Sequence, residues 1–162
     1  MDVLLVRHAK SDYDWQKWPT DNVRPLSKIG VNRQHKVAQG MVKFGLIYDA
    51  VWVSPYVRAQ ETLQIIQSYQ EKYIEPKIVN ELRVAGDPEK VLSLLFEQNK
   101  DTPNQRLLLV GHNPNMTNLL ELIINDGSYI EMRTSDLAHC KITDNHSELI
   151  KFYSRNDLMV DG

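Results

Sequence analysis

The 162-residue chain has a single cysteine, Cys140, and only seven glycines and seven prolines. A lone cysteine excludes an intrachain disulfide, and no second cysteine or suitably spaced histidines accompany it to form a structural zinc site. The low glycine and proline content, beside 42% hydrophobic and 25% charged residues, excludes collagen-like and disordered classes. A chain of this length and composition is predicted to form one globular domain over residues 1–162.

Long apolar runs and clusters of basic residues are also missing. No stretch approaches the ~18 consecutive apolar residues of a membrane-spanning helix, and the first residues lack the basic and apolar regions of a secretion signal. The formal net charge of −2, without runs of Lys or Arg, argues against nucleic acid or an anionic membrane as a partner. We therefore expect a cytoplasmic protein that binds neither.

The charge that is present is unevenly distributed. The first 45 residues hold eight Lys or Arg and four Asp, whereas the rest of the chain holds 11 basic and 17 acidic residues. The mild net charge therefore conceals a basic N-terminal region, which is compatible with a local site for a small anion.

Strand and helix signals alternate along the chain. Short apolar runs predict strands at 3–6, 50–53, 77–79 and 106–110. Capping residues, three of them followed by proline, predict helix starts at Ser27, Ser54-Pro55, Asp87-Pro88 and Asn113-Pro114. Two final runs, 137–142 and 148–153, predict an antiparallel hairpin. This order predicts an α/β protein, a three-layer α/β/α sandwich whose mostly parallel sheet has an antiparallel edge.

Basic and polar side chains follow three of the predicted parallel strands. Arg7 and His8 follow the first strand. Arg58 lies one turn into the helix after the second strand, and His112 follows the strand at 106–110. Because ligands of open α/β sheets bind at the carboxyl ends of the strands, we expect these residues to converge on one edge. Two predicted helix N-termini at the same edge add main-chain N–H groups that favour an anion.

This set of residue types fits a phosphoryl group. Two guanidinium groups and a histidine can bind its oxygens and neutralise its charge. A neutral histidine is also a covalent nucleophile, so either His8 or His112 is a candidate to accept the group. Each of the four residues taken singly is better explained as a structural side chain, and only their convergence favours a functional site. For His35, His139 and His146 the structural interpretation is favoured.

Four segments at these residues resemble the histidine phosphatase superfamily, the phosphoglycerate mutase-like group named for an Arg-His-Gly motif after its first strand. Ala9 stands where the motif usually has glycine. The segments are Leu5 to Ser11, Arg24 to Ser27 with Gly30, Ser54 to Thr62, and Val110 to Pro114. The short chain and the Arg-His-Ala-Lys-Ser and Arg-Pro-Leu-Ser segments are most similar to the SixA-type phosphohistidine phosphatases.

The resemblance implies an α/β/α fold and a two-step hydrolase that needs no metal or other cofactor. It implies that His8 is the nucleophile, that Arg7 and Arg58 bind the phosphoryl oxygens, and that His112 completes the phosphate pocket. Two neighbouring polar residues, Ser11 and Asn113, are further candidates for phosphate binding, although Ser11 can equally cap the loop.

The general acid and the role of Arg24 stay open. Glu81, in the segment Val79 to Leu82, matches the setting of a proton-donating glutamate in mutase-like relatives and is therefore the candidate acid. The alternative is that Glu81 is a solvated surface residue without a catalytic role. The mechanism does not depend on Glu81, because the histidine nitrogen that leaves a phosphohistidine can take its proton from solvent. Arg24 either reaches the substrate or pairs with an acidic residue nearby.

The expected elements leave only residues 12–22 as an appreciable loop, so no long insertion covers the predicted site. An open site favours a phosphohistidine presented on a protein surface, and hence a phosphohistidine phosphatase. Small phosphorylated molecules, such as phosphate monoesters, are the alternative substrates. A phosphate-binding module without catalytic activity is the alternative outside the enzymes.

Overall fold

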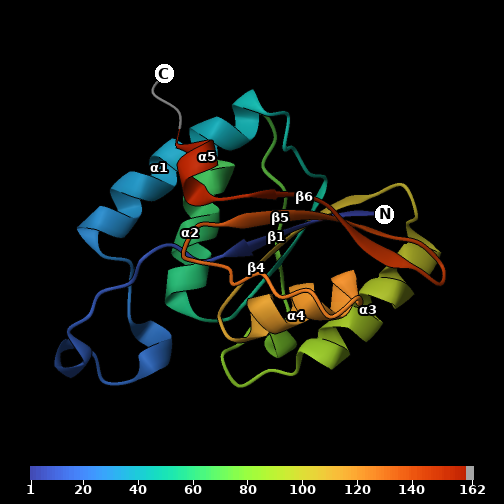
Figure 1. Cartoon of the computed structure of the whole chain (residues 1–162). Coiled ribbons are helices and arrows are strands. Elements are labelled where there is room, and N and C mark those ends of the chain that lie inside the picture. The colour runs from blue at the N-terminus through green and yellow to red at the C-terminus, as the bar shows by residue number, and fades with distance from the viewer. Residues whose placement is uncertain (160–162) are drawn as a thin grey trace.

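The computed structural model describes residues 1–159 and contains a six-stranded sheet in the order β3-β2-β4-β1-β5-β6 (Figure 1). The strands are β1 (Asp2–Arg7), β2 (Ala50–Val53), β3 (Lys77–Ile78), β4 (Arg106–Gly111), β5 (Leu137–Ile142) and β6 (Ser147–Tyr153). The first four run parallel to one another, and β5 and β6 form the antiparallel edge. Residues 160–162 of the predicted domain lie outside the described part.

The central strands are apolar on both faces, which places them in the middle of a layered fold. In β1, Val3 and Leu5 belong to the buried cluster on one face, whereas Leu4 and Val6 belong to the cluster on the other. The parallel neighbour β4 alternates in the same way, and the register of the pair brings like faces together.

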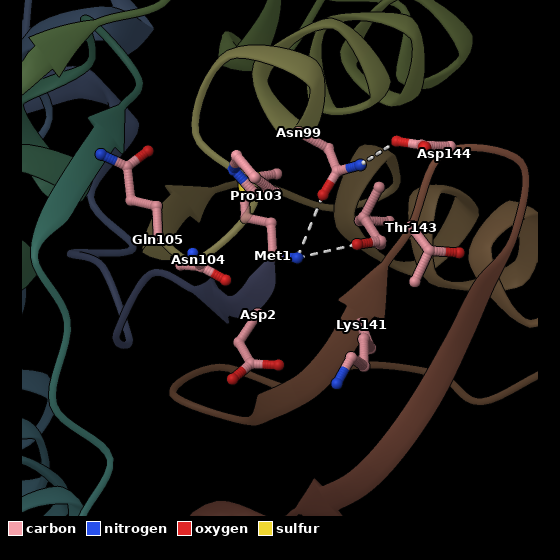
Figure 2. A pocket seen from close by; sticks show the side chains of 10 residues that line it. Met1, Asp2, Asn99, Pro103, Asn104, Gln105, Lys141, Thr143 and Asp144 are labelled. Carbon is pink, nitrogen blue, oxygen red and sulfur yellow. Dashed lines mark hydrogen bonds between the residues drawn. The ribbon is translucent and has the colours of Figure 1, made fainter.

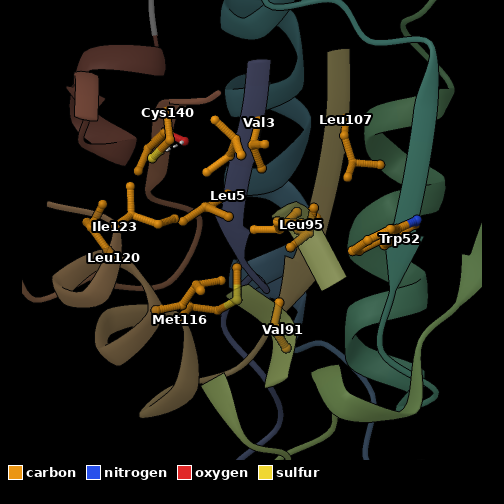
Figure 3. Close-up of a cluster of buried hydrophobic side chains, with 14 of the residues drawn as sticks. Val3, Leu5, Trp52, Val91, Leu95, Leu107, Met116, Leu120, Ile123 and Cys140 are labelled. Carbon is orange, nitrogen blue, oxygen red and sulfur yellow. Dashed lines mark hydrogen bonds between the residues drawn. The ribbon is translucent and has the colours of Figure 1, made fainter. Parts of the chain in front are cut away.

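Helices cover both faces of the sheet (Figure 1). One face carries α3 (Pro88–Asp101) and α4 (Asn115–Ile124), and the other carries α1 (Lys28–Lys43), α2 (Val57–Gln67) and α5 (Arg155–Leu158). Figure 3 shows the first of these cores, where Leu95 of α3 and Leu120 of α4 pack toward Val3 and Leu5. The predicted three-layer sandwich with an antiparallel edge is therefore confirmed. Within residues 1–159, no helix combines the length and apolar character needed to cross a membrane.

Two predicted helix starts are wrong, the first by two residues and the second by one. The helix expected from Ser54-Pro55 begins at Val57, because the Ser54 hydroxyl accepts the Tyr56 N–H and contacts His112 instead of capping a helix. The helix expected from Asn113-Pro114 begins at Asn115. By contrast, Ser27 and Asp87 cap α1 and α3 through their side chains, as predicted.

The short helix α5 was not predicted, although its signal is present in the sequence. The Ser154 and Asp157 side chains form a capping box with the main chain of this turn. Helix α5 lies against α1, where a Cβ atom on Gly40 would come within 1.8 Å of the Leu158 carbonyl oxygen. Only glycine at position 40 permits this close approach of the two helices.

Candidate active site

His8 is the first residue after β1, at the carboxyl edge of the sheet. Its main-chain N–H donates to the Gly111 carbonyl of β4, and its side-chain Nδ1 lies 2.6 Å from the Ala9 carbonyl. Because a carbonyl can only accept, Nδ1 carries the proton and Nε2 keeps its lone pair. Burial, together with the charges of Arg58 and Arg7, lowers the pKa of His8 to about 3. His8 is therefore a neutral imidazole near pH 7 with Nε2 available as a nucleophile.

The loop that follows His8 is fixed by contacts to two helices. The Ala9 N–H donates to the Thr62 hydroxyl at 3.0 Å, and this hydroxyl donates to the Arg58 carbonyl in the first turns of α2. On the other side, a Cβ atom on Gly30 would lie 2.0 Å from the Lys10 carbonyl oxygen. The glycine of α1 thus allows the helix to pack directly on the His8 loop.

His112 leaves the neighbouring strand β4 and faces His8. The centroids of the two imidazole rings lie 4.9 Å apart, and Tyr56 packs edge-on against His112. His112 Nε2 lies 2.7 Å from the Ser54 hydroxyl, whereas Nδ1 is buried and has no hydrogen-bond partner among residues 1–159. Burial first, and then the charges of His8 and Arg58, lower the pKa of His112 to about 2. Both rings of the pair are therefore uncharged near pH 7.

Two arginines, the half-buried Arg7 and the buried Arg58, complete the group. Arg7 donates through Nη1 to the Met132 carbonyl at 3.0 Å, and Arg58, which is 4% exposed, is bound to Asp21 through both Nη atoms. Burial lowers the pKa of both guanidinium groups, but a guanidinium stays protonated in proteins. The Nε atoms of Arg7 and Arg58 are buried and have no partner among the described residues.

Arg24 and Ser11 form a second layer around Arg58. Arg24 Nε and Nη2 donate to Asp21 Oδ1 at 3.1 and 3.0 Å, and Nη1 donates to the Ser11 hydroxyl and to the Asp12 carbonyl. Of the two roles left open for Arg24, the structure therefore shows the pairing with an acidic residue. Burial raises the pKa of the Asp21 carboxyl, but the hydrogen bonds from Arg58 and Arg24 outweigh it, and the net pKa is lowered.

Asn113 and Glu81 make contacts of a structural kind. The Asn113 amide donates to the Met132 carbonyl at 2.7 Å and accepts from the N–H and hydroxyl of Thr117. Glu81 lies in the 3₁₀ turn Asn80–Leu82 and accepts from the Asp87 N–H at 3.4 Å. Within residues 1–159, no hydrogen bond joins either side chain to His8 or His112.

Sequence reasoning missed two residues of this site, Asp21 and Ser54. Asp21 stands three residues before Arg24, a spacing at which an acidic and a basic side chain can meet in a helical turn, so a signal was present. Ser54 was assigned to helix capping, and its contact with His112 spans 58 positions of the chain. No local signal reports such a contact.

The site is distinguished by hydrogen-bond donors that have no acceptor among the described residues. Arg7 Nε, Arg58 Nε and His112 Nδ1 are all buried and have no partner in the part of the chain that the structure describes, and the charges of Arg7 and Arg58 act on both histidines. A buried polar group without a partner is costly unless a ligand satisfies it. Two cationic donors and an imidazole around a neutral His8 can bind the oxygens of a tetrahedral anion. No three Asp, Glu, His or Cys side chains within residues 1–159 are grouped as ligands for a metal ion.

Comparison with known proteins agrees with this geometry. A profile of the histidine phosphatase superfamily (branch 1) matches residues 3–84, which carry Arg7, His8 and Arg58. The chain belongs to this superfamily. An uncharacterised protein from Picosynechococcus sp. is 30% identical over 123 residues, which cover 76% of this chain and 73% of that protein.

Two solved structures share the fold over nearly the whole chain. The protein histidine phosphatase SixA complexed with tungstate has a TM-score of 0.89 at 22% identity and covers 98% of this chain and 99% of its own. A candidate SixA phosphohistidine phosphatase from Agrobacterium tumefaciens has a TM-score of 0.77 at 26% identity and covers 94% and 97%. The expected resemblance to SixA-type members of the superfamily is confirmed.

A polar hollow lies at the opposite end of the parallel strands from the two histidines (Figure 2). Its volume is about 390 Å³, and residues at the amino ends of β1 and β4 and the carboxyl end of β5 line it. The Met1 main-chain nitrogen donates to the Asn99 side chain at 3.1 Å and to the Ile142 carbonyl at 2.8 Å, and Asn99 donates in turn to Asp144. Within residues 1–159, no buried side-chain polar atom of its lining lacks a partner.

Proposed function

We propose that this protein is a phosphohistidine phosphatase that removes a phosphoryl group from a protein histidine through a phosphorylated His8. One observation carries the proposal: a neutral histidine with an unprotonated Nε2 is surrounded by three buried donors that have no partner among the described residues. The likeness to SixA structures, one of which holds the tetrahedral oxyanion tungstate, supports it.

In the first step, the lone pair of His8 Nε2 forms a bond to phosphorus while the P–N bond of the substrate phosphohistidine breaks. The departing imidazole nitrogen keeps the electron pair and takes a proton from solvent. Arg7, Arg58 and His112 hold the phosphoryl oxygens as charge develops on them. His112 donates through Nδ1, and the Ser54 hydroxyl donates to its Nε2 and so keeps the proton on Nδ1.

In the second step, a water molecule attacks phosphorus and the bond to His8 Nε2 breaks. Nε2 regains its lone pair, the water proton passes to solvent, and inorganic phosphate leaves. Because His8 returns to its neutral form, the hydrogen bond from Nδ1 to the Ala9 carbonyl holds the ring in the same orientation throughout the cycle.

The surroundings of the nucleophile favour a nitrogen leaving group over an alkoxide. An alkoxide needs a positioned acid, yet two arginines lower the pKa of Asp21, and Glu81 is bound to the Asp87 main chain. An imidazole nitrogen is protonated by solvent as it leaves. The substrate we propose is therefore a phosphohistidine on a protein.

The test is a quench experiment with a phosphotransfer protein labelled at its phosphohistidine. We expect an acid-labile, base-stable label on His8, lost with all activity in His8→Ala and retained in His146→Ala, a variant of the exposed hairpin histidine. A His8→Ala variant with full activity would refute the assignment of His8 as the nucleophile.

A substrate panel separates the remaining possibilities. Sugar and nucleotide monophosphates are compared with the phosphohistidine protein by kcat/KM. A clear preference for the esters would replace the proposed substrate by small phosphate monoesters. Binding of inorganic phosphate without turnover of any substrate would instead indicate a phosphate-binding module.

A further inference from the structure

Asp21, in the 3₁₀ turn Asp21–Val23, is held by two arginines at once. Arg58 reaches it with Nη1 at 2.9 Å from the main-chain carbonyl and 3.3 Å from Oδ1, and with Nη2 at 3.0 Å from Oδ2. Arg24 donates to the same carboxylate through Nε and Nη2. No other described carboxylate makes hydrogen bonds to two arginine side chains.

The contacts of Arg58 are confined to one end of its guanidinium group. The planar group carries five N–H donors in a fixed arrangement, so binding at the two Nη atoms orients all the others. The remaining donors are Nε–H and the second hydrogen of Nη2, which lie along the same edge of the planar group. Nε is buried and without a partner among residues 1–159.

We propose that Asp21 is a positioning residue, which clamps the Nη end of Arg58 so that its Nε side is presented to the phosphoryl group. The inference rests on the proposed function, because it assigns Arg58 to phosphate binding. Arg24 holds the Asp21 carboxylate in place by two further hydrogen bonds, and Ser11 in turn accepts a hydrogen bond from Arg24. Asp21 thereby acts on the phosphoryl group through Arg58.

The contacts favour this role over competition between Asp21 and phosphate for Arg58. A competing carboxylate would occupy the donors that the ligand needs, yet Nε is left unoccupied. Release of Asp21 would also require more than a side-chain rotation, since its main-chain carbonyl holds Arg58 as well. A clamp and a competitor predict opposite changes in phosphate affinity when the carboxylate is removed.

The test measures the affinity of inorganic phosphate for wild type and for Asp21→Asn by calorimetry. The amide keeps the size of the side chain but loses the charge and one acceptor for Arg58. We expect an affinity about 10-fold weaker. The matched control is Asp14→Asn, which removes the same charge from the same loop at a side chain that contacts Lys17 and the Gln16 N–H, and should leave the affinity unchanged. Equal or tighter phosphate binding by Asp21→Asn would overturn the proposal.

A kinetic readout separates positioning from a general loss of structure. If Asp21→Asn merely lowered the fraction of folded enzyme, kcat would fall with KM unchanged. A misplaced Arg58 raises KM as well, because Arg58 holds the phosphoryl oxygens before and during the reaction. A lower kcat with an unchanged KM would therefore contradict the clamp.

The phosphate measurement does not depend on turnover. If the wild type bound phosphate, with weaker binding in Asp21→Asn, but hydrolysed no phosphohistidine, the proposed function would fail and the role of Asp21 would stand. If the wild type hydrolysed phosphohistidine and phosphate bound equally to both proteins, the function would stand and the role of Asp21 would fall.

Discussion

The hollow at the amino end of the parallel strands and the two histidines at the carboxyl end differ in how the buried polar side chains around them are satisfied. At the amino end, Met1, Asn99 and Asp144 satisfy one another within the chain (Figure 2). At the carboxyl end, His8 and His112 share their surroundings with arginine nitrogens that have no partner. The difference teaches that several unsatisfied donors gathered around one side chain, more than the presence of a hollow, indicate where a ligand belongs.

Charge separates the two ends as well. Arg7, Arg24 and Arg58 surround the two histidines, and Asp21 is the acidic residue bound among them. The amino end combines Lys141 with Asp2 and Asp144 in its lining, so its charges offset one another. Only the carboxyl end therefore has the positive character that a phosphoryl group requires.

Loss of an arginine at each end is the strongest test of this contrast. We expect Arg58→Ala to lower kcat/KM by about 10³-fold, because a buried cationic donor to the phosphoryl group is lost. Arg106→Ala, which removes an arginine paired with Asp2 across 3.9 Å at the amino end, should change kcat/KM by less than about twofold. Steady-state kinetics of both variants, with thermal melts to verify folding, make the comparison. Equal losses of activity would remove the distinction between the two ends.

Inorganic phosphate should stabilise the protein through the carboxyl end only. At 100 times its dissociation constant it adds about 2.7 kcal/mol to the free energy of unfolding, which corresponds to a Tm rise of roughly 5–10 °C. Calorimetry on the wild type and on Arg58→Ala measures the gain and its loss. Chemical-shift mapping locates the ion, and shifts at Asn99 in place of His112 would assign phosphate to the hollow at the amino end.

Removal of Asn99 should affect stability and leave catalysis unchanged. Asn99 is 2% exposed, and its truncation to alanine leaves the Met1 nitrogen and Asp144 without this partner. We expect Asn99→Ala to lower the free energy of unfolding by about 2 kcal/mol, and kcat/KM should not change. The exposed neighbour Asn104, changed to alanine, should cost within about 0.5 kcal/mol. Urea unfolding and kinetics test both variants, and a loss of kcat/KM in Asn99→Ala would couple the two ends.

Acid should weaken the carboxyl end through its neutral histidines. The pKa of His8 is about 3 in the folded protein, so below the unfolded value of 6.5 the unfolded chain binds the proton and the folded chain does not. Stability contributed by neutral His8 is therefore present above pH 6.5 and is lost as the pH falls toward 3, by about 1.4 kcal/mol per pH unit. His8→Asn should show a correspondingly shallower fall in urea unfolding between pH 6.5 and 4.5. Parallel curves for both proteins would show that His8 is not buried in its neutral form.

Most elements of the fold could be predicted because their signals are local. The apolar run in β1 and the capping residues Ser27 and Asp87 act within a few positions of the chain, and the structure has the strand and helices they predict. The start of α2 could not be predicted, since Ser54 has the same local preference for a helix cap and for a turn. Its contact with His112, from a distant strand, decides between them.

The candidate site likewise has features that could be predicted from the sequence and features that could not. The juxtaposition of His8 and His112 could be predicted, because they follow the carboxyl ends of β1 and β4, and parallel strands end at the same edge of the sheet. The amide of Asn113 could not be placed from sequence, since its binding to Met132 and Thr117 depends on the segment between α4 and β5. The clamp of Asp21 on Arg58 likewise joins residues 37 positions apart.

The sequence by itself determined the layered α/β architecture and the residue types at the carboxyl ends of the strands, because periodicity, capping and strand order are properties of short segments and their succession. Tertiary structure alone decided the protonation of His8, the position of Asp21, and the lack of a partner within residues 1–159 for the Nε atoms of Arg7 and Arg58. These depend on burial and on distances between segments far apart in the chain, and burial removes the water that would otherwise hydrate each charge and satisfy each donor.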